Sequence, residues 1–133
     1  MDEKKSLNDL YEQGLTQMHE QFGPDSDKYL APLKDIAPFF ERLNVEFPYG
    51  CIYTRKDKLD LRVRSLATIS GLTVLGHSHA QLKLHIEGAL IVGATEQEII
   101  EVIAQMTCYC GFPLATQALM LAKEVFDKVS KKD

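Results

Sequence analysis

Tryptophan is absent from this chain of 133 residues, and cysteine is scarce, with only Cys51, Cys108 and Cys110 present. An odd number of cysteines excludes a framework in which every thiol is paired in a disulfide. Unpaired and mostly buried thiols are the usual state of such residues in a reducing cytosol. We therefore expect structural cysteines and no disulfide scaffold.

Long apolar runs and a surplus of positive charge are also missing. No apolar stretch reaches the length of about 20 residues that a membrane-spanning helix needs, and the first residues lead into an amphipathic segment, not into the apolar core of a signal peptide. The chain has 15 Lys and Arg residues against 19 Asp and Glu residues, a net charge of -4. Phosphate binding needs concentrated positive charge, and the short run 55–58 is best interpreted as a solvated loop. We expect a cytoplasmic protein with no nucleic-acid partner and no membrane partner.

Strand-like alternation of polar and apolar residues has no useful length in this sequence, and no internal repeat is present. Apolar residues make up 45% of the chain, which is ordinary for a globular protein, and they recur at helical spacing. A length of 133 residues suits one domain. We predict a single all-α domain, residues 1–133, of about six helices.

Capping residues, glycines and prolines set the bounds of the expected helices. The helices are expected from a capping box at Ser6 to Phe22, from Pro38 through Leu43, from Asp60 to about Leu75, from Ser78 to Val92, from a capping box at Thr95 to Cys110, and from Pro113 into residues 128–133. Three prolines interrupt residues 25–48, which therefore hold only short helices. The first helix is expected to bury one apolar face, made of Leu7, Leu10, Tyr11, Leu15, Met18 and Phe22.

Two segments carry more apolar surface than one small domain can cover. Helix 60–75 has apolar residues all round its axis, which is typical of a helix buried on most sides. Residues 47–58 are the least regular part of the chain, and their aromatic residues predict a loop packed on the core or on a neighbouring subunit. Identical subunits usually cover such surface in closed symmetry, so we predict a homo-oligomer.

Helix 78–92 presents a histidine to its inner side. At about 100° per residue, His85 lies nearly opposite Lys83 and Glu87, which mark the solvated face. Two interpretations are open. His85 is either a core histidine satisfied by a carbonyl or a neighbouring carboxylate, or a general acid/base that works near neutral pH.

Metal binding and a dithiol pair are disfavoured by spacing. His77, His79 and His85 do not have the i, i+4 spacing of a helical metal pair, and no acidic residue lies nearby to complete a site. We therefore expect no metal. Cys108 and Cys110 lie two residues apart on a helix, which turns their sulfurs about 200° away from each other. They can pair only if that turn unwinds.

Two arginines fall in the first turns of the apolar helix 60–75. Arg62 and Arg64 are either exposed at a solvated edge or directed into a cavity near His85. In the second placement a guanidinium group would bind a carboxylate through two parallel hydrogen bonds. The spacing leaves both placements open.

A series of short motifs runs through the second half of the chain. The motifs are Tyr49-Gly50, Arg55, Leu59-Asp60-Leu61-Arg62, Arg64-Ser65-Leu66, Gln81-Leu82, His85-Ile86, Gly88-Ala89-Leu90, Gly93, Glu98-Ile99, Glu101-Val102-Ile103, Tyr109, Gly111-Phe112-Pro113 and Ala118. In their order and spacing they resemble the carboxymuconolactone decarboxylase family, which shares its fold with the alkyl-hydroperoxidase D (AhpD) proteins. The resemblance covers about residues 49–126 and leaves residues 1–48 as an N-terminal helical extension.

The resemblance implies an AhpD-like helical fold assembled into a ring, most often a hexamer, with a trimer or dimer as alternatives. In the redox branch of the family, a Cys-x-x-Cys pair precedes the histidine and a glutamate lies on the preceding helix. Here Ser78 and Gln81 stand at the cysteine positions, and Ser65-Leu66 stands at the glutamate position. Thiolate chemistry cannot proceed without the thiols. The resemblance therefore favours the decarboxylase branch, although a family-level label of peroxiredoxin activity is expected.

The function that the resemblance implies is a cofactor-free lyase of aromatic-compound breakdown. Its substrate would be 4-carboxymuconolactone or a related small lactone or carboxylic acid, and it would need no metal or organic cofactor. The expected roles are His85 as acid/base, Arg64 as carboxylate anchor, and Gln81 or Tyr109 as polar donors. Glu101 is a weaker candidate, because it lies away from the apolar stripe of its helix.

Two alternatives belong to other functional classes. One is a redox protein that uses the three cysteines in a different arrangement, and the other is a non-catalytic oligomeric protein that binds a ligand. An active site near a subunit boundary follows if Arg55 or Tyr53 reaches the His85 of a neighbouring subunit.

Overall fold

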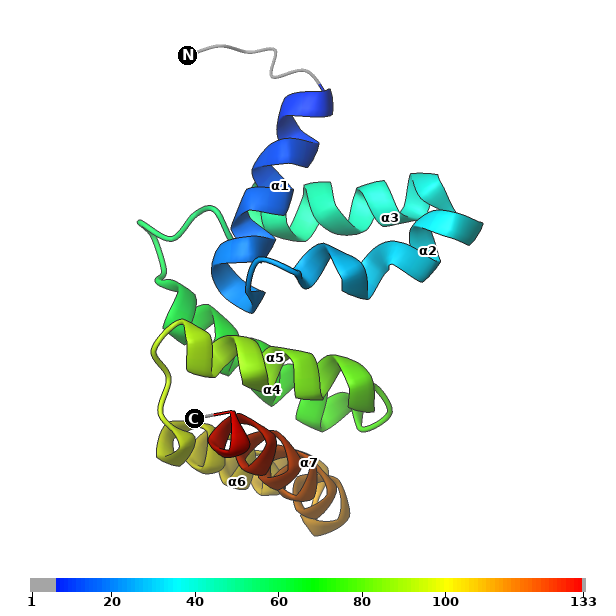
Figure 1. Ribbon diagram of the computed structural model, residues 1–133. Coiled ribbons are helices and arrows are strands. Elements are labelled where there is room, and N and C mark those ends of the chain that lie inside the picture. Colours follow the sequence, from blue (N-terminus) through cyan, green and yellow to red (C-terminus); the bar gives the residue numbers. More distant parts are fainter. Residues whose placement is uncertain (1–6, 133) are drawn as a thin grey trace. The chain divides into compact units, whose positions relative to one another are not determined.

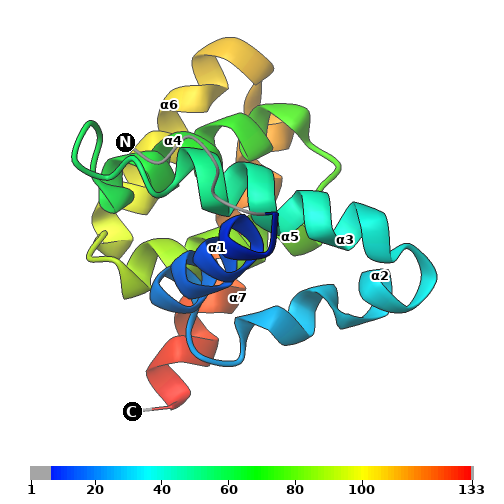
Figure 2. The same cartoon turned by 90° about the horizontal axis from the view of Figure 1, so that it is seen from above.

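The computed structural model describes residues 7–132, which form seven α-helices and two short helical turns, η1 and η2, and contain no strand (Figures 1 and 2). The predicted all-α class is confirmed. The chain divides into two compact units, Met1–Asp60 and Leu61–Asp133, and each is described by itself. The prediction of a single domain over residues 1–133 stays a prediction.

The first unit is built from short helices, as its prolines predict. It contains α1 (Leu7–Phe22), the 3-10 turn η1 (Ser26–Leu30), α2 (Ala31–Ile36), α3 (Pro38–Val45) and the π-helical turn η2 (Glu46–Ile52). Pro32 and Pro38 lie in the first turns of α2 and α3, where a missing N–H leaves no hydrogen bond unmade. The capping box predicted at Ser6 lies outside the described residues.

The segment 47–58, predicted as a loop, is helical in its first half. The π-helical turn η2 continues α3 as far as Ile52, and only the residues after it form a loop. Pro48 lacks an N–H and would break a regular α-helix. The wider turn accommodates it, and the Tyr53 N–H donates to the Pro48 carbonyl oxygen at 2.8 Å, an i to i+5 bond.

The buried side of α1 is rotated away from the predicted apolar face. Leu10, Tyr11 and Leu15 are only half-buried. The buried residues are Gly14, Gln17, Met18, Gln21 and Phe22. The cause is a close helix approach at the glycines: a Cβ atom added to Gly14 would lie 2.4 Å from the Val45 carbonyl oxygen, and one added to Gly50 would lie 3.0 Å from Leu10.

The second unit is a four-helix arrangement of α4 (Leu61–Leu75), α5 (His79–Ile91), α6 (Glu96–Cys110) and α7 (Phe112–Lys131). α4 packs against α5 and α6, and α7 packs against the same two helices (Figure 1). The four helices therefore share one core. The buried core consists of Ile69, Leu82, Ile86, Ala89, Ala94, Ile99, Ile103, Ala118, Ala122 and Val125.

The predicted helix starts of this unit are confirmed. Ser78 is the N-cap residue of α5, and Pro113 lies in the first turn of α7. The capping box of α6 is complete: the Glu98 N–H donates to Thr95 Oγ1, and the Thr95 N–H donates to Glu98 Oε1, both at 3.0 Å. Each of these helix starts depends on residues within a few positions of one another, so the sequence is enough to predict it.

α4 is not buried on most sides, which corrects the prediction for this helix. One stripe is buried, consisting of Leu61, Ser65, Ile69 and Thr73, and two of its four members are polar. Val74 and Leu75 are among the exposed apolar residues of the helix. Apolar residues placed all round an axis therefore do not by themselves bury a helix.

Among residues 7–132, no helix combines the length and the apolar character that crossing a bilayer requires.

The close approach at Gly14 predicts that Gly14→Ala destabilises the protein by about 1–3 kcal/mol or more, because the new methyl group meets a backbone oxygen that cannot rotate away. Gly71→Ala is the matched control. Nothing lies within 4 Å of a Cβ atom added there in α4, and alanine should raise stability by about 0.5–1 kcal/mol. Urea unfolding followed by circular dichroism measures both changes. A Gly14→Ala protein as stable as the Gly71→Ala protein would contradict the close packing.

Candidate functional site

His85 lies on the inner side of α5, as the spacing predicts. It is only 7% exposed. Leu82, Ile86 and Ala89 of the same helix belong to the core of the second unit. His85 is about 60° around the axis from Leu82, so it flanks this core stripe.

Burial changes the acid–base character of His85. Desolvation lowers the pKa of its imidazole from the ordinary value of 6.5 to about 4. The free protein then holds His85 in its neutral form at pH 7, and its role as an acid/base stays a prediction. A neutral imidazole has one donor nitrogen and one acceptor nitrogen, so it can still give one hydrogen bond and receive another.

Ion pairs to α7 fix the opposite side of α5. Lys83 Nζ lies 2.5 Å from Glu124 Oε2, and Lys128 Nζ lies 3.4 Å from Glu87 Oε2. Lys83 and Glu87 are half-buried, so this face is less solvated than predicted. The core on one side and the ion pairs on the other leave α5 little freedom to rotate, and the orientation of His85 follows from both.

The two arginines of α4 have different surroundings. Arg62 forms an ion pair with Glu98 of α6, and both side chains are partly exposed. Of its two predicted placements, this is the one at a solvated edge. Arg64 is half-buried, next to the fully buried Ser65. Because α4 packs against α5, Arg64 and His85 belong to one pair of packed helices.

The other predicted donors are on the surface. Gln81 is exposed in the first turn of α5, one turn before His85, so the two side chains lie on nearly the same side of that helix. Tyr109 lies in the last turn of α6, and it is 74% exposed. Glu101 is exposed, in agreement with its position away from the apolar stripe.

The cysteines are free thiols, but the prediction that they are mostly buried is wrong. Cys51 and Cys108 are exposed, and Cys110 is half-buried. The Cys110 thiol donates to the carbonyl oxygen of Met106 at 3.1 Å. Cys51 lies in η2 and the other two near the end of α6, where the helix surface is not covered by its own unit.

No group of three or more His, Cys, Asp or Glu side chains suited to a metal comes together within the described part of the chain. His79 lies against Gln117 of α7, and a ring nitrogen of His77 lies 3.2 Å from Ser78 Oγ. The absence of a metal in the working protein stays a prediction.

Sequence reasoning missed most of the buried polar side chains, among them four with polar atoms that make no hydrogen bond. Gln21 and Ser65 are fully buried, Ser26 is 1% exposed and Gln17 is 2% exposed. Within residues 7–132 the hydroxyls of Ser26 and Ser65, the Gln17 amide nitrogen and both polar atoms of the Gln21 amide make no hydrogen bond. Leaving such groups unsatisfied costs about 1–3 kcal/mol each, so they are expected near functional surfaces. The signal that could have found the glutamines is their spacing of four residues on the side of α1 that carries Gly14.

Known proteins similar to this chain point to one family. Residues 38–124 match the carboxymuconolactone decarboxylase family. The 4-carboxymuconolactone decarboxylase of Acinetobacter baylyi is 32% identical over 117 residues, covering 87% of this chain and 86% of the relative. The nitrosuccinic acid decarboxylase of Metarhizium robertsii is 31% identical over 126 residues, covering 92% and 85%. An uncharacterised 15.0 kDa protein of Paracoccus denitrificans is 31% identical over 112 residues, covering 83% of each chain.

The lowered pKa of His85 predicts a specific dependence of stability on pH. Between about pH 6.5 and pH 4 the unfolded chain binds a proton at this position and the folded protein does not. Protonation therefore favours unfolding, and stability falls as the pH is lowered through this window, by at most about 1.4 kcal/mol per pH unit.

Urea unfolding of the wild type and of His85→Gln at several pH values between 4 and 7 measures this contribution. The difference in unfolding free energy between the two proteins isolates His85 from the other titrating groups. A difference that does not change with pH would contradict the buried neutral histidine.

Proposed function

This chain belongs to the carboxymuconolactone decarboxylase family, and on that premise we propose that it is a cofactor-free decarboxylase of a small lactone or carboxylic acid, with His85 at its active site. The observation that carries the proposal is that two relatives named as decarboxylases match this chain over 85% or more of their own lengths. Their names specify different acids, so we propose 4-carboxymuconolactone as the first substrate to test and nitrosuccinic acid as the second.

The chemistry of this reaction class sets what the protein must supply. For 4-carboxymuconolactone the bond between the ring carbon and the carboxylate breaks, and carbon dioxide leaves. The electron pair enters the conjugated system and places negative charge on the lactone carbonyl oxygen. A proton then adds to carbon. A fixed hydrogen-bond donor at that oxygen lowers the barrier most, because it acts where the charge develops.

His85 suits both parts of this demand. Its neutral imidazole can donate an N–H to the developing oxyanion in a site of low dielectric, where such a bond is stronger than in water. An anionic substrate beside the ring would raise the lowered pKa of His85 again, because an opposite charge favours the protonated form. Substrate binding would then bring a proton to the ring, from which it can pass to carbon.

The remaining roles follow from position and residue type. We assign Arg64 to the substrate carboxylate, because a guanidinium group binds a carboxylate with two parallel hydrogen bonds. Gln81 lies one turn before His85 on α5, on nearly the same side of that helix, and we assign it as a polar donor. Tyr109 is so exposed that it can enclose a ligand only if another surface covers it.

The redox alternative depends on thiols whose positions do not favour it. Cys108 and Cys110 point to different sides of α6, and Cys110 donates to a carbonyl of its own helix. A variant with all three cysteines replaced by serine should keep its decarboxylase activity. A non-catalytic binding protein would bind the acid and release no carbon dioxide.

The activity prediction concerns His85→Ala. This change should lower the rate of carbon dioxide release by about two to four orders of magnitude, the usual contribution of a positioned acid/base group. The measurement is carbon dioxide release from 4-carboxymuconolactone, and then from nitrosuccinic acid. His77→Ala is the matched control, because His77 is an exposed histidine just before the same helix. Equal activity of His85→Ala and the wild type would contradict the proposed role of His85.

We further propose that the protein is a homo-oligomer, with a hexamer as the first expectation and a trimer or dimer as alternatives. Large apolar side chains are exposed on both units, among them Ile36 (81%), Phe39 (70%) and Phe47 (64%) on the first and Phe112 (76%) on the second. Apolar surface of this kind is typical of an interface between subunits.

A subunit boundary could also complete the active site. Of the two residues expected to reach a neighbour, Tyr53 has its ring stacked on Tyr49, with centroids 5.3 Å apart. Arg55 is exposed on the loop that follows η2, so we assign the longer reach to it.

Sedimentation velocity at several concentrations tests the assembly. We expect a species that is a multiple of the 15.0 kDa chain. Phe39→Glu, which places a charge in the exposed apolar surface of α3, should shift the protein towards smaller species without changing its circular dichroism. A wild-type monomer of 15.0 kDa at every concentration would contradict the proposal.

A further inference from the structure

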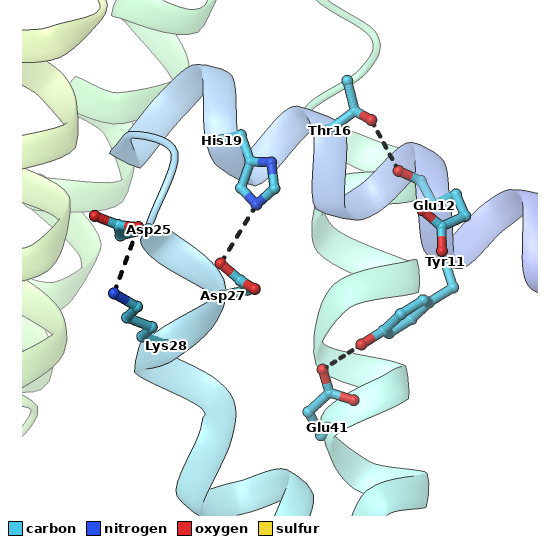
Figure 3. Close-up of polar contacts among 8 residues, drawn as sticks. All are labelled: Tyr11, Glu12, Thr16, His19, Asp25, Asp27, Lys28 and Glu41. Atoms are coloured by element: carbon cyan, nitrogen blue, oxygen red, sulfur yellow. Dashed lines mark hydrogen bonds and ion pairs between the residues drawn. The ribbon is translucent and has the colours of Figure 1, made fainter.

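A hollow with a cavity volume of about 380 Å³ lies within the first unit. It is enclosed by α1, η1, α2 and α3, and Figure 3 shows several of its polar residues. The lining consists of Tyr11, Glu12, Leu15, Asp27, Lys28, Leu30, Ala31, Lys34 and Glu41. Its size is within the range of about 300–1,000 Å³ that is usual for sites of small molecules.

Glu41 is the least exposed charged group of this lining. It lies on α3, is 5% exposed, and accepts a hydrogen bond of 2.8 Å from the Tyr11 hydroxyl of α1 (Figure 3). Burial, together with the hydrogen bond to Glu41 and the charge of that carboxylate, raises the pKa of Tyr11 to about 12. The tyrosine therefore stays a neutral donor at physiological pH.

This buried carboxylate has no cationic partner among residues 7–132. The neighbouring Arg42 pairs with Glu46, at 2.5 Å, and stacks over the Tyr11 ring. Lys28, which also lines the hollow, lies 3.5 Å from Asp25. A carboxylate can accept about four hydrogen bonds, and burying its charge with one neutral donor is costly. Glu41 thus has both the charge and the spare acceptor capacity to receive a cation.

The rest of the lining indicates which kind of cation fits. Glu12 and Asp27 add negative charge, and Lys28 and Lys34 add positive charge at exposed positions, so the carboxylates outnumber the ammonium groups. Asp27 lies 3.5 Å from His19 (Figure 3). Leu15, Leu30 and Ala31 form an apolar wall. The acidic side chains do not gather into a group of three that could hold a metal ion, within the residues that the structure describes. The buried Glu41 carboxylate beside an apolar wall favours an organic cation over a metal ion.

We propose that the hollow binds a small organic cation, a primary ammonium group on a short apolar chain. The ammonium group donates to the Glu41 carboxylate, which keeps its bond from Tyr11, and the chain lies against Leu15 and Leu30. This site is built from the first unit alone and does not depend on the decarboxylase chemistry proposed for His85.

Titration with n-butylammonium tests the site, followed by isothermal calorimetry and by the NMR signals of the Tyr11 ring, which Tyr11→Phe identifies. The wild type should saturate below about 50 mM with shifts of the Tyr11 ring. Glu41→Gln keeps the shape and an acceptor for Tyr11 but removes the charge, so affinity should fall about tenfold or more. Asp35→Asn is the matched control, because it removes the same charge from α2 at an exposed position outside the hollow, and it should bind as the wild type does.

Several results would overturn the proposal. They are equal binding by Glu41→Gln and the wild type, binding of n-butyrate as strong as that of n-butylammonium, and saturation without any shift of the Tyr11 ring. Circular dichroism checks that Glu41→Gln is folded. If it is not, Glu12→Gln, on the exposed side of the lining, takes its place with an expected loss of about two- to fivefold, and an unchanged affinity would count against the site.

Discussion

Desolvation of one imidazole is the constraint from which the chemistry of the second unit follows. His85 flanks a core stripe of α5, while Lys83 and Glu87 hold the other side of that helix to α7. Because the ring is buried, its pKa falls to about 4, and the free protein contains a neutral donor and acceptor in place of a charge. In the function that we propose, an anionic substrate would supply the charge that changes the protonation of this ring. This change in the protonation of His85 does not require any other residue to titrate.

The first unit depends on a different constraint, the close approach of α1 to the chain around α3 and η2. Gly14 allows that approach, and the approach decides which side of α1 is buried. Gln17 and Gln21 become buried as a result, and Tyr11 turns towards Glu41 and the hollow. Both units therefore bury polar groups at positions where packing alone would favour apolar ones. Among these buried groups, Glu41 in the first unit and His85 in the second are the ones to which we assign binding or chemistry.

Features that depend on neighbouring residues in the sequence were predicted, and features that depend on tertiary packing were not. The capping box at Thr95 and the first-turn position of Pro38 depend on neighbours within a few residues, and the structure confirms both. The inward direction of His85 follows from helical periodicity and is confirmed, whereas the lowered pKa of its imidazole depends on the side chains that pack around it. The burial of α1, of α4 and of the cysteines also depends on what packs against each helix, which no spacing within one helix specifies. Residues 47–58 were predicted as a loop from their irregular pattern, whereas the π-helical turn η2 continues the helix around Pro48 as far as Ile52.

The central claim is that the family's chemistry is carried here by a buried, neutral histidine whose protonation responds to the substrate. NMR titration of the imidazole protons tests it most directly, with the His85 signal identified by its loss in His85→Gln. We predict that His85 titrates near pH 4 in the free protein, well below the ordinary value of 6.5 for an imidazole, and that its pKa rises when a non-reactive dicarboxylate analogue binds. A pKa of 6 to 7 in the free protein, unchanged by the bound analogue, would contradict it.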